Sequence, residues 1–174
     1  MNIAILASGN GSNFEAIAKA VKQGDIKANI KLLLTDKENA FARKRAARFN
    51  IPELFIDPRK FSSRLDYDKE ILKLLKKEKI DLIVLAGFMR ILGHDFVKSF
   101  KNKILNIHPA LLPAFKGGDA IRMAYNYGNK ITGVTVHFVN EKVDNGPIIL
   151  QEAVCIKKGV SLSELEKKIH NIEH

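Results

Sequence analysis

The chain has 174 residues, of which 46% are hydrophobic, so it can bury one sizeable core. It carries 29 Lys and Arg against 19 Asp and Glu, and this net charge of +10 would attract an anionic substrate. No apolar stretch approaches membrane-spanning length and no basic leader precedes the first apolar run. We therefore expect a single cytoplasmic domain over residues 1–174 with no membrane partner.

Short apolar runs alternate with helical patterns from the first residues onward. Strands are expected at residues 3–7, 30–34, 54–56, 82–85 and 104–107, and helices at residues 13–21, 40–49, 67–79 and 94–100. This alternation predicts an α/β fold with a mostly parallel central sheet covered by helices on both faces.

The pattern changes near the C-terminal end. Residues 132–139 alternate with a period of two, and another apolar strand follows at Ile148 after a turn signal, so antiparallel pairing is expected there. The last helix is expected from Ser161, which has Glu164 in capping-box spacing. The single cysteine, Cys155, lies in the apolar run and is expected to fill core space.

The basic charge also permits a nucleic-acid-binding module. The basic residues are scattered along helical segments such as residues 69–79, and aromatic residues make up only 7% of the chain. A solvated lysine face explains this pattern better than a nucleic-acid surface does, so no nucleic-acid partner is predicted.

A glycine-rich segment, SGNGSN at residues 8–13, joins the first strand to the first helix. Glycine lets the backbone approach a ligand closely, and free N–H groups at a helix start favour a phosphate. Phe14 stands where the dinucleotide fingerprint requires glycine, so a single phosphate is the better candidate. The alternative is a tight turn in which Ser12 or Asn13 caps the helix.

A second candidate site combines Asn106, His108 and Asp144. On an extended segment Asn106 and His108 point the same way, at the carboxyl end of a strand where open parallel sheets bind ligands. An aspartate in a turn needs no function by itself. If the turn folds back, however, the Asp144 carboxylate would favour the imidazolium form of His108, as a general acid near neutral pH requires. His137 is interpreted as a structural strand residue.

Four motifs in this order resemble the glycinamide ribonucleotide transformylases, a family of folate-dependent formyltransferases. They are GNGSN at 9–13, VLAGFMRIL at 84–92, LNIHPALLP at 105–113, and TGVTVHFV at 132–139 followed by Asp144. The resemblance implies a Rossmann-like formyltransferase fold and transfer of the formyl group of 10-formyltetrahydrofolate to the amine of 5'-phosphoribosylglycinamide in purine biosynthesis. It further implies small-molecule substrates, no metal, and a monomer or homodimer.

The resemblance also implies roles for individual residues. The catalytic residues would be Asn106, His108 and Asp144. The substrate phosphate and ribose would be bound by Gly11, Ser12, Asn13, His170 and Glu173. Folate would be bound by Arg64, Met89, Arg90, Ile91, Leu92, Asn106, Asn140, Glu141, Lys142, Val143 and Asp144.

Relatives in this family continue through a further helical stretch, so we expect the C-terminus at His174 to be truncated relative to them. The ending HNIEH at residues 170–174 also spells an inverted zinc-protease motif, but no downstream acidic ligand follows it. Methionyl-tRNA formyltransferase and formyltetrahydrofolate hydrolase use the same co-substrate, but both normally carry an additional domain, so we expect neither of these activities from this chain.

Overall fold

The computed structural model describes all 174 residues. Their contacts divide into two compact units, Met1–Leu105 and Asn106–His174. The single-domain organisation stays a prediction, because two such units can belong to one domain. No helix combines the length and the apolar character needed to cross a membrane.

The first unit contains four parallel strands in the order β3-β2-β1-β4. Their bounds are β1 Asn2–Leu6, β2 Asn29–Thr35, β3 Glu53–Phe55 and β4 Leu82–Leu85. β1 lies between two neighbours, with Ile5 opposite Leu33 on one side and Val84 on the other. A strand paired on both edges and covered on both faces must be apolar throughout, which explains the continuous apolar runs in the sequence.

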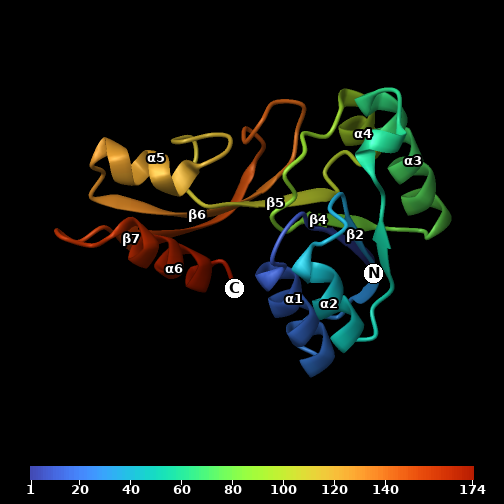
Figure 1. Cartoon of the computed structure of the whole chain (residues 1–174), viewed down its shortest axis with the longest axis horizontal. Helices are drawn as coiled ribbons and strands as arrows, with labels where there is room; N and C mark the ends of the chain where they lie inside the picture. The colour runs from blue at the N-terminus through green and yellow to red at the C-terminus, as the bar shows by residue number, and fades with distance from the viewer. The chain divides into compact units, whose positions relative to one another are not determined.

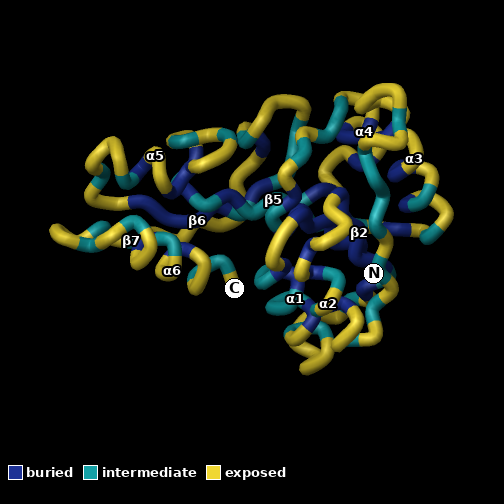
Figure 2. The backbone as a smooth tube through the Cα atoms, in the orientation of Figure 1, coloured by how far each residue is buried: buried dark blue, intermediate teal, exposed yellow.

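Helices lie on both sides of these strands (Figure 1). The helices α1 (Ser12–Gln23) and α2 (Phe41–Arg48) are on one side, and α3 (Arg64–Lys77) and α4 (His94–Ser99) are on the other. Figure 2 shows the strands buried between helices whose outer surfaces are exposed. Ile5 of β1 belongs to the same buried cluster as Phe14 of α1 and Ala42 of α2.

The second unit contains the strand order β5-β6-β7, with β6 and β7 antiparallel. The strands are β5 (Ile104–His108), which starts at the end of the first unit, β6 (Ile131–Phe138) and β7 (Ile148–Cys155). The helices are α5 (Ala120–Tyr127) and α6 (Leu162–Ile172). Ile121, Val134 and Leu165 bring α5, β6 and α6 into one buried cluster.

The predicted fold class is confirmed, with a mostly parallel sheet, antiparallel strands near the C-terminal end and helices around it. The Ser161–Glu164 capping box is also confirmed. Helix α5 and a short 3₁₀ turn at Pro58–Lys60 were not predicted.

The prediction for Cys155 is wrong, because its side chain is exposed. β7 is the last strand in the order and pairs with β6 alone. Its apolar residues therefore lie largely in contact with solvent, and Leu150 is 61% exposed.

Candidate active site

Three polar side chains of the second unit converge on the carboxylate of Asp144. The amide Nδ2 of Asn106 donates to Asp144 Oδ1 at 3.3 Å, and His108 Nδ1 lies 3.3 Å from Asp144 Oδ2. His137 Nε2 lies 3.6 Å from Oδ1. Asn106 and His108 sit two residues apart on β5, so their side chains reach the same carboxylate from one face of the strand.

The carboxylate of Asp144 is shielded from solvent and still favours its charged form. Its side chain is 11% exposed, and those of His108 and His137 are more buried still. Burial alone would raise the pKa of Asp144. Hydrogen bonds from His137 and the Gly117 N–H, together with the charges of the two histidines, outweigh burial and lower the pKa of Asp144 below its usual value.

Both ring nitrogens of His108 face oxygen acceptors. Nδ1 faces the Asp144 carboxylate, and Nε2 lies 2.8 Å from the carbonyl oxygen of Phe115. A carbonyl and a carboxylate can only accept, so an imidazolium satisfies both contacts whereas a neutral imidazole satisfies one. The surroundings of His108 thus suit a proton donor.

His137 belongs to this cluster, although the sequence favoured a purely structural role for it. Its Nδ1 lies 2.9 Å from the Phe138 carbonyl oxygen, which requires a proton on that nitrogen. Its Nε2 lies 3.1 Å from Asn106 Nδ2 and 3.6 Å from Asp144 Oδ1, so it accepts from the amide when the ring is neutral and faces the carboxylate as a donor when the ring is protonated. The one signal in the sequence was a polar residue among the apolar positions of a strand, and it did not indicate which side chain His137 would meet.

The chain that follows His108 is held by buried hydrogen bonds. The hydroxyl of Thr135 donates to the Ala110 carbonyl at 2.7 Å and accepts from the Leu112 N–H at 3.0 Å. Gln151 on β7 donates to the Leu112 carbonyl and to Thr135. Further along, the Gly117 N–H donates to Asp144 Oδ2 at 2.8 Å. These contacts fix the segment that carries the Phe115 carbonyl.

In the first unit, the glycine-rich segment forms a tight turn before α1. Gly11 is the N-cap residue, with a φ of 74°, and no side chain caps the helix, so the alternative of a Ser12 or Asn13 cap is not supported. A Cβ at Gly11 would lie 2.6 Å from the Cβ of Ala42, which only glycine avoids. The N-terminal end of α1, which no side chain caps, carries the partial positive charge that favours an anion.

The predicted folate segment, Met89–Leu92, lies between β4 and α4. Its ends are anchored, because the Met89 N–H donates to Ser8 Oγ and the Gly93 N–H donates to Asp68 Oδ2, each at 2.8 Å. Met89 is 75% exposed, so a large apolar side chain is held in solvent on a fixed backbone. Such a side chain suits contact with a flat apolar ligand.

Asp68 and Arg64 both lie on α3, beside that segment. Arg64 is the first residue of the helix, three residues earlier than the sequence predicted. Burial raises the pKa of Asp68, while the Gly93 N–H and the charges of Arg64 and Arg90 oppose the rise.

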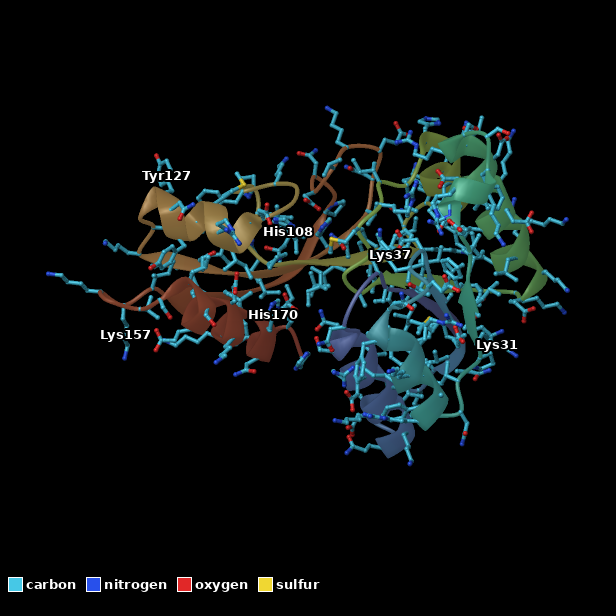
Figure 3. All side chains as sticks on the ribbon, in the orientation of Figure 1. Lys31, Lys37, His108, Tyr127, Lys157 and His170 are labelled. Atoms are coloured by element: carbon cyan, nitrogen blue, oxygen red, sulfur yellow. The ribbon has the colours of Figure 1, made fainter.

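The remaining predicted residues lie in the second unit. In the Asn140–Asp144 loop, Asn140 accepts from the Lys142 N–H at 3.0 Å and donates to the Asn145 carbonyl at 3.1 Å. His170 and Glu173 lie at the end of α6, with His170 Nδ1 3.3 Å from Glu173 Oε2. Figure 3 labels His108 and, on α6, His170. No group of three or more His, Cys, Asp or Glu side chains within either unit is arranged to hold a metal ion.

Comparisons with known proteins agree on one family. The model of the family described as "Formyl transferase" matches residues 1–174. Phosphoribosylglycinamide formyltransferase of Bacillus subtilis is 42% identical over 98% of this chain and 88% of its own length. The trifunctional purine biosynthetic protein adenosine-3 of Gallus gallus is 42% identical over the whole chain, which spans only 17% of that protein.

A solved structure resembles the fold closely. The crystal structure of phosphoribosylglycinamide formyltransferase from Bacillus halodurans has a TM-score of 0.97 and 43% identity, and the match covers 99% of this chain and 89% of that one.

Proposed function

The chain belongs to the formyl transferase family, and we propose that it transfers the formyl group of 10-formyltetrahydrofolate to the amine of 5'-phosphoribosylglycinamide. The products are formylglycinamide ribonucleotide and tetrahydrofolate. The observation that carries this proposal is the cluster of Asn106, His108 and Asp144, a buried arrangement of hydrogen-bond donors around a carboxylate. Relatives that match the chain along its length bear the names of this activity.

In the proposed reaction the amine of the nucleotide attacks the formyl carbon of the folate. A carbon–nitrogen bond forms, and the carbonyl oxygen of the formyl group gains negative charge in a tetrahedral intermediate. The Asn106 amide and the imidazolium of His108 stabilise this oxygen by donating hydrogen bonds. The bond to N10 of the folate then breaks, and the proton lost by the amine is delivered to N10.

The contacts of the cluster suggest which atoms would donate. His108 Nδ1 is held by Asp144, so Nε2 is the nitrogen that would donate to the intermediate, in exchange for the Phe115 carbonyl. Both amide hydrogens of Asn106 are directed to Asp144 and His137, so one of these contacts would also be exchanged. Such rearrangement on substrate binding is common in active sites.

The two substrates would be bound by separate sets of residues. The phosphate of the nucleotide would be held by the backbone at Gly11, Ser12 and Asn13, and the rest of the nucleotide by His170 and Glu173. The folate would contact residues 89–92, residues 140–144 and Asn106, and the cation of Arg64 would favour an anionic group.

Several further properties are proposed with this function. We propose one formyltransferase domain, a cytoplasmic location, a monomer or homodimer, and small-molecule partners rather than nucleic acid. The proposed reaction needs no metal, because hydrogen-bond donors and a direct attack supply the chemistry.

The test is to incubate the purified protein with 5'-phosphoribosylglycinamide and 10-formyltetrahydrofolate and to follow loss of the formyl group from the folate. We expect turnover that requires both substrates. Filter binding to RNA run in parallel tests the competing class of function. RNA binding without formyl transfer would overturn the proposal.

A further inference from the structure

The carbonyl groups of the glycine-rich segment are held by α2. The Ala42 N–H donates to the Gly9 carbonyl at 3.1 Å, and Nε of Arg45 donates to the Asn10 carbonyl at 2.9 Å. In a trans peptide the C=O and the following N–H point in opposite directions. The N–H groups of Asn10 and Gly11 are therefore turned away from α2. Consecutive N–H groups that face one side form an anion-binding concavity.

Arg45 contacts this segment through two hydrogen bonds to Asn10. Its Nη2 donates to Asn10 Oδ1 at 2.6 Å, so one guanidinium grips both the backbone and the side chain of Asn10. Its Nη1 forms an ion pair with Glu15, and its guanidinium lies 5.0 Å from the ring centre of Phe41. The side chain is only 17% exposed, and its contacts with Asn10, Glu15 and Phe41 hold the guanidinium in place.

The ion pair with Glu15 also matters for an anion. Glu15 lies in the first turn of α1, the part of the helix that attracts negative charge. An uncompensated carboxylate there would repel a phosphate bound at the same helix start. Lys19 lies 3.4 Å from Glu15, but its side chain is 60% exposed and is screened by solvent. Arg45 supplies the shielded countercharge.

We propose that Arg45 is a positioning residue for the anion-binding segment. It holds the Asn10 carbonyl so that the next N–H faces the phosphate, and it neutralises Glu15 without touching the phosphate itself. This inference rests on the proposed function, which assigns the phosphate of the nucleotide to residues 11–13. The inference goes beyond that assignment, because it makes phosphate binding depend on a residue of α2 that does not contact the phosphate.

The test compares Arg45→Ala, Arg45→Lys and Arg43→Ala. Arg43 is a matched control on the same helix, because it forms a two-pronged ion pair with Glu53 and does not contact the glycine-rich segment. Each variant is measured for the KM of the nucleotide, the KM of the folate, kcat, and the rise in melting temperature on addition of inorganic phosphate.

We expect Arg45→Ala to raise the nucleotide KM roughly tenfold to a hundredfold, because small displacements of a binding group are costly. The folate KM should change less than about twofold, since the contacts of Arg45 are to Asn10, Glu15 and Phe41 and to none of the residues assigned to the folate. Stabilisation by phosphate should be lost. Arg45→Lys keeps the charge but offers a single nitrogen, so it should fall between Arg45→Ala and wild type. Arg43→Ala should match wild type in every binding measurement.

A purely structural role for Arg45 predicts a different result, in which Arg45→Ala lowers the melting temperature and leaves both KM values and the response to phosphate unchanged. That result overturns the inference, and so does an equal rise of the nucleotide KM in Arg43→Ala. If Arg45→Ala does not fold, Arg45→Lys and Asn10→Ala decide the question by the same measurements.

Stabilisation by inorganic phosphate and formyl transfer are measured separately, so the inference and the proposed function can fail independently. A wild-type protein that binds phosphate through Arg45 but transfers no formyl group would contradict the function alone. Normal formyl transfer with no dependence on Arg45 would contradict the inference alone. A wild-type protein that phosphate does not stabilise would also overturn the inference.

Discussion

At the scale of single residues, Asp144 is the point at which the polar cluster is joined. One oxygen faces Asn106 and His137, and the other faces His108 and the Gly117 N–H. A carboxylate that serves several donors is used as a fixed anion rather than as a proton carrier, which agrees with its lowered pKa. We therefore expect Asp144 to act on the reaction through its neighbours.

Coupling between His108 and Asp144 is the first prediction. His108→Ala should lower kcat about a hundredfold to a thousandfold, the usual effect of losing one donor to a developing oxyanion. Asp144→Asn should also lower kcat, because it removes the charge that favours the imidazolium. In the double variant the second change should cost much less than it does alone, since its effect passes through the imidazole. The kcat values of the four proteins give the coupling energy, and full additivity would contradict it.

Asn106 carries the second prediction. Asn106→Ala should lower kcat by roughly a hundredfold to a thousandfold while the KM of the nucleotide changes little and that of the folate rises far less than kcat falls, because the amide acts chiefly on the intermediate. Asn129→Ala is a suitable control, because this half-buried amide donates to the nearby Ile131 carbonyl, outside the cluster around Asp144. A large rise in either KM without loss of kcat would place Asn106 in binding rather than in catalysis.

At the scale of elements, the start of α1 depends on glycine at position 11. Any other residue there meets both a strained φ of 74° and the side chain of Ala42. Gly24, at the other end of α1, has a φ of 88° but open space around its Cβ position. The two glycines therefore share the backbone strain and differ in the contact with α2.

The third prediction compares these two glycines. Gly24→Ala should cost about 1 kcal/mol of unfolding free energy through backbone strain and leave both KM values unchanged. Gly11→Ala should cost more and should also raise the nucleotide KM, because the displaced segment carries the proposed phosphate site. Denaturant unfolding and steady-state kinetics measure the two effects. Equal effects of the two variants on stability and on the nucleotide KM would show that the contact between Gly11 and α2 does not affect phosphate binding.

The fourth prediction concerns Asp68, which ties the folate segment to α3. Burial raises the pKa of Asp68 above its ordinary value of 3.8, so the folded protein favours the neutral carboxyl. The stabilisation that the neutral carboxyl provides is therefore complete below pH 3.8 and is lost as the pH rises through the raised pKa. Asp68→Asn keeps an oxygen acceptor for the Gly93 N–H and should raise the melting temperature at pH 7 by a few degrees. The gain should vanish below pH 3.8.

The control for Asp68 is Asp66→Asn on the same helix. Asp66 is exposed and bonds the hydroxyl of Ser63, so its substitution should give no gain at pH 7. A destabilised Asp68→Asn protein at pH 7 would mean that the charges of Arg64 and Arg90 matter more to folding than burial does.

The sequence predicted those elements whose signals lie in neighbouring residues, and it missed features that depend on distant parts of the chain. The parallel strands of the first unit and α6 have local signals, in apolar runs and in the Ser161–Glu164 capping box. Helix α5 is only eight residues long, and its N-cap, Asp119, provides no capping hydrogen bond, so its start had no such signal. The exposure of β7 depends on its having one neighbour, which hydrophobicity alone does not reveal.

The candidate site divides in the same way. The two-residue spacing of Asn106 and His108 follows from strand geometry and could be predicted from sequence. The approach of Asp144, by contrast, depends on a turn between β6 and β7, and a residue in a turn can face several directions. The inclusion of His137 was missed because its partners, Asn106 and Asp144, lie 31 residues before it and in the turn that follows. The hydrogen bonds from Arg45 to the glycine-rich segment could not be predicted for the same reason, since 35 residues separate Arg45 from Asn10.

At the scale of the whole molecule, charge is distributed unevenly along the chain. Met1–Leu105 carries 21 Lys and Arg against 12 Asp and Glu, a net charge of +9, whereas residues 106–174 carry 8 against 7, a net charge of +1. The unit with the glycine-rich segment therefore holds nearly all of the net positive charge. A field of this sign concentrates anions near that unit and raises the rate at which they associate.

The last prediction follows from this asymmetry and from the phosphate of the proposed substrate. Raising the salt concentration from about 0.02 to 0.5 M shortens the range of the field to a few ångströms, so kcat/KM for the nucleotide should fall several-fold. The kcat at saturating substrate should stay nearly constant, because the field acts on encounter and not on the bound complex. Steady-state kinetics over a salt series measures both quantities, and the melting temperature at each salt concentration verifies that folding is unaffected.

Charge reversal of exposed lysines in the last turn of α3, at the opposite end of the helix from Arg64, such as Lys76→Glu with Lys77→Glu, should lower kcat/KM at low salt and have little effect at high salt. A kcat/KM that is flat across the series would show that the basic surface serves another purpose than attracting the substrate.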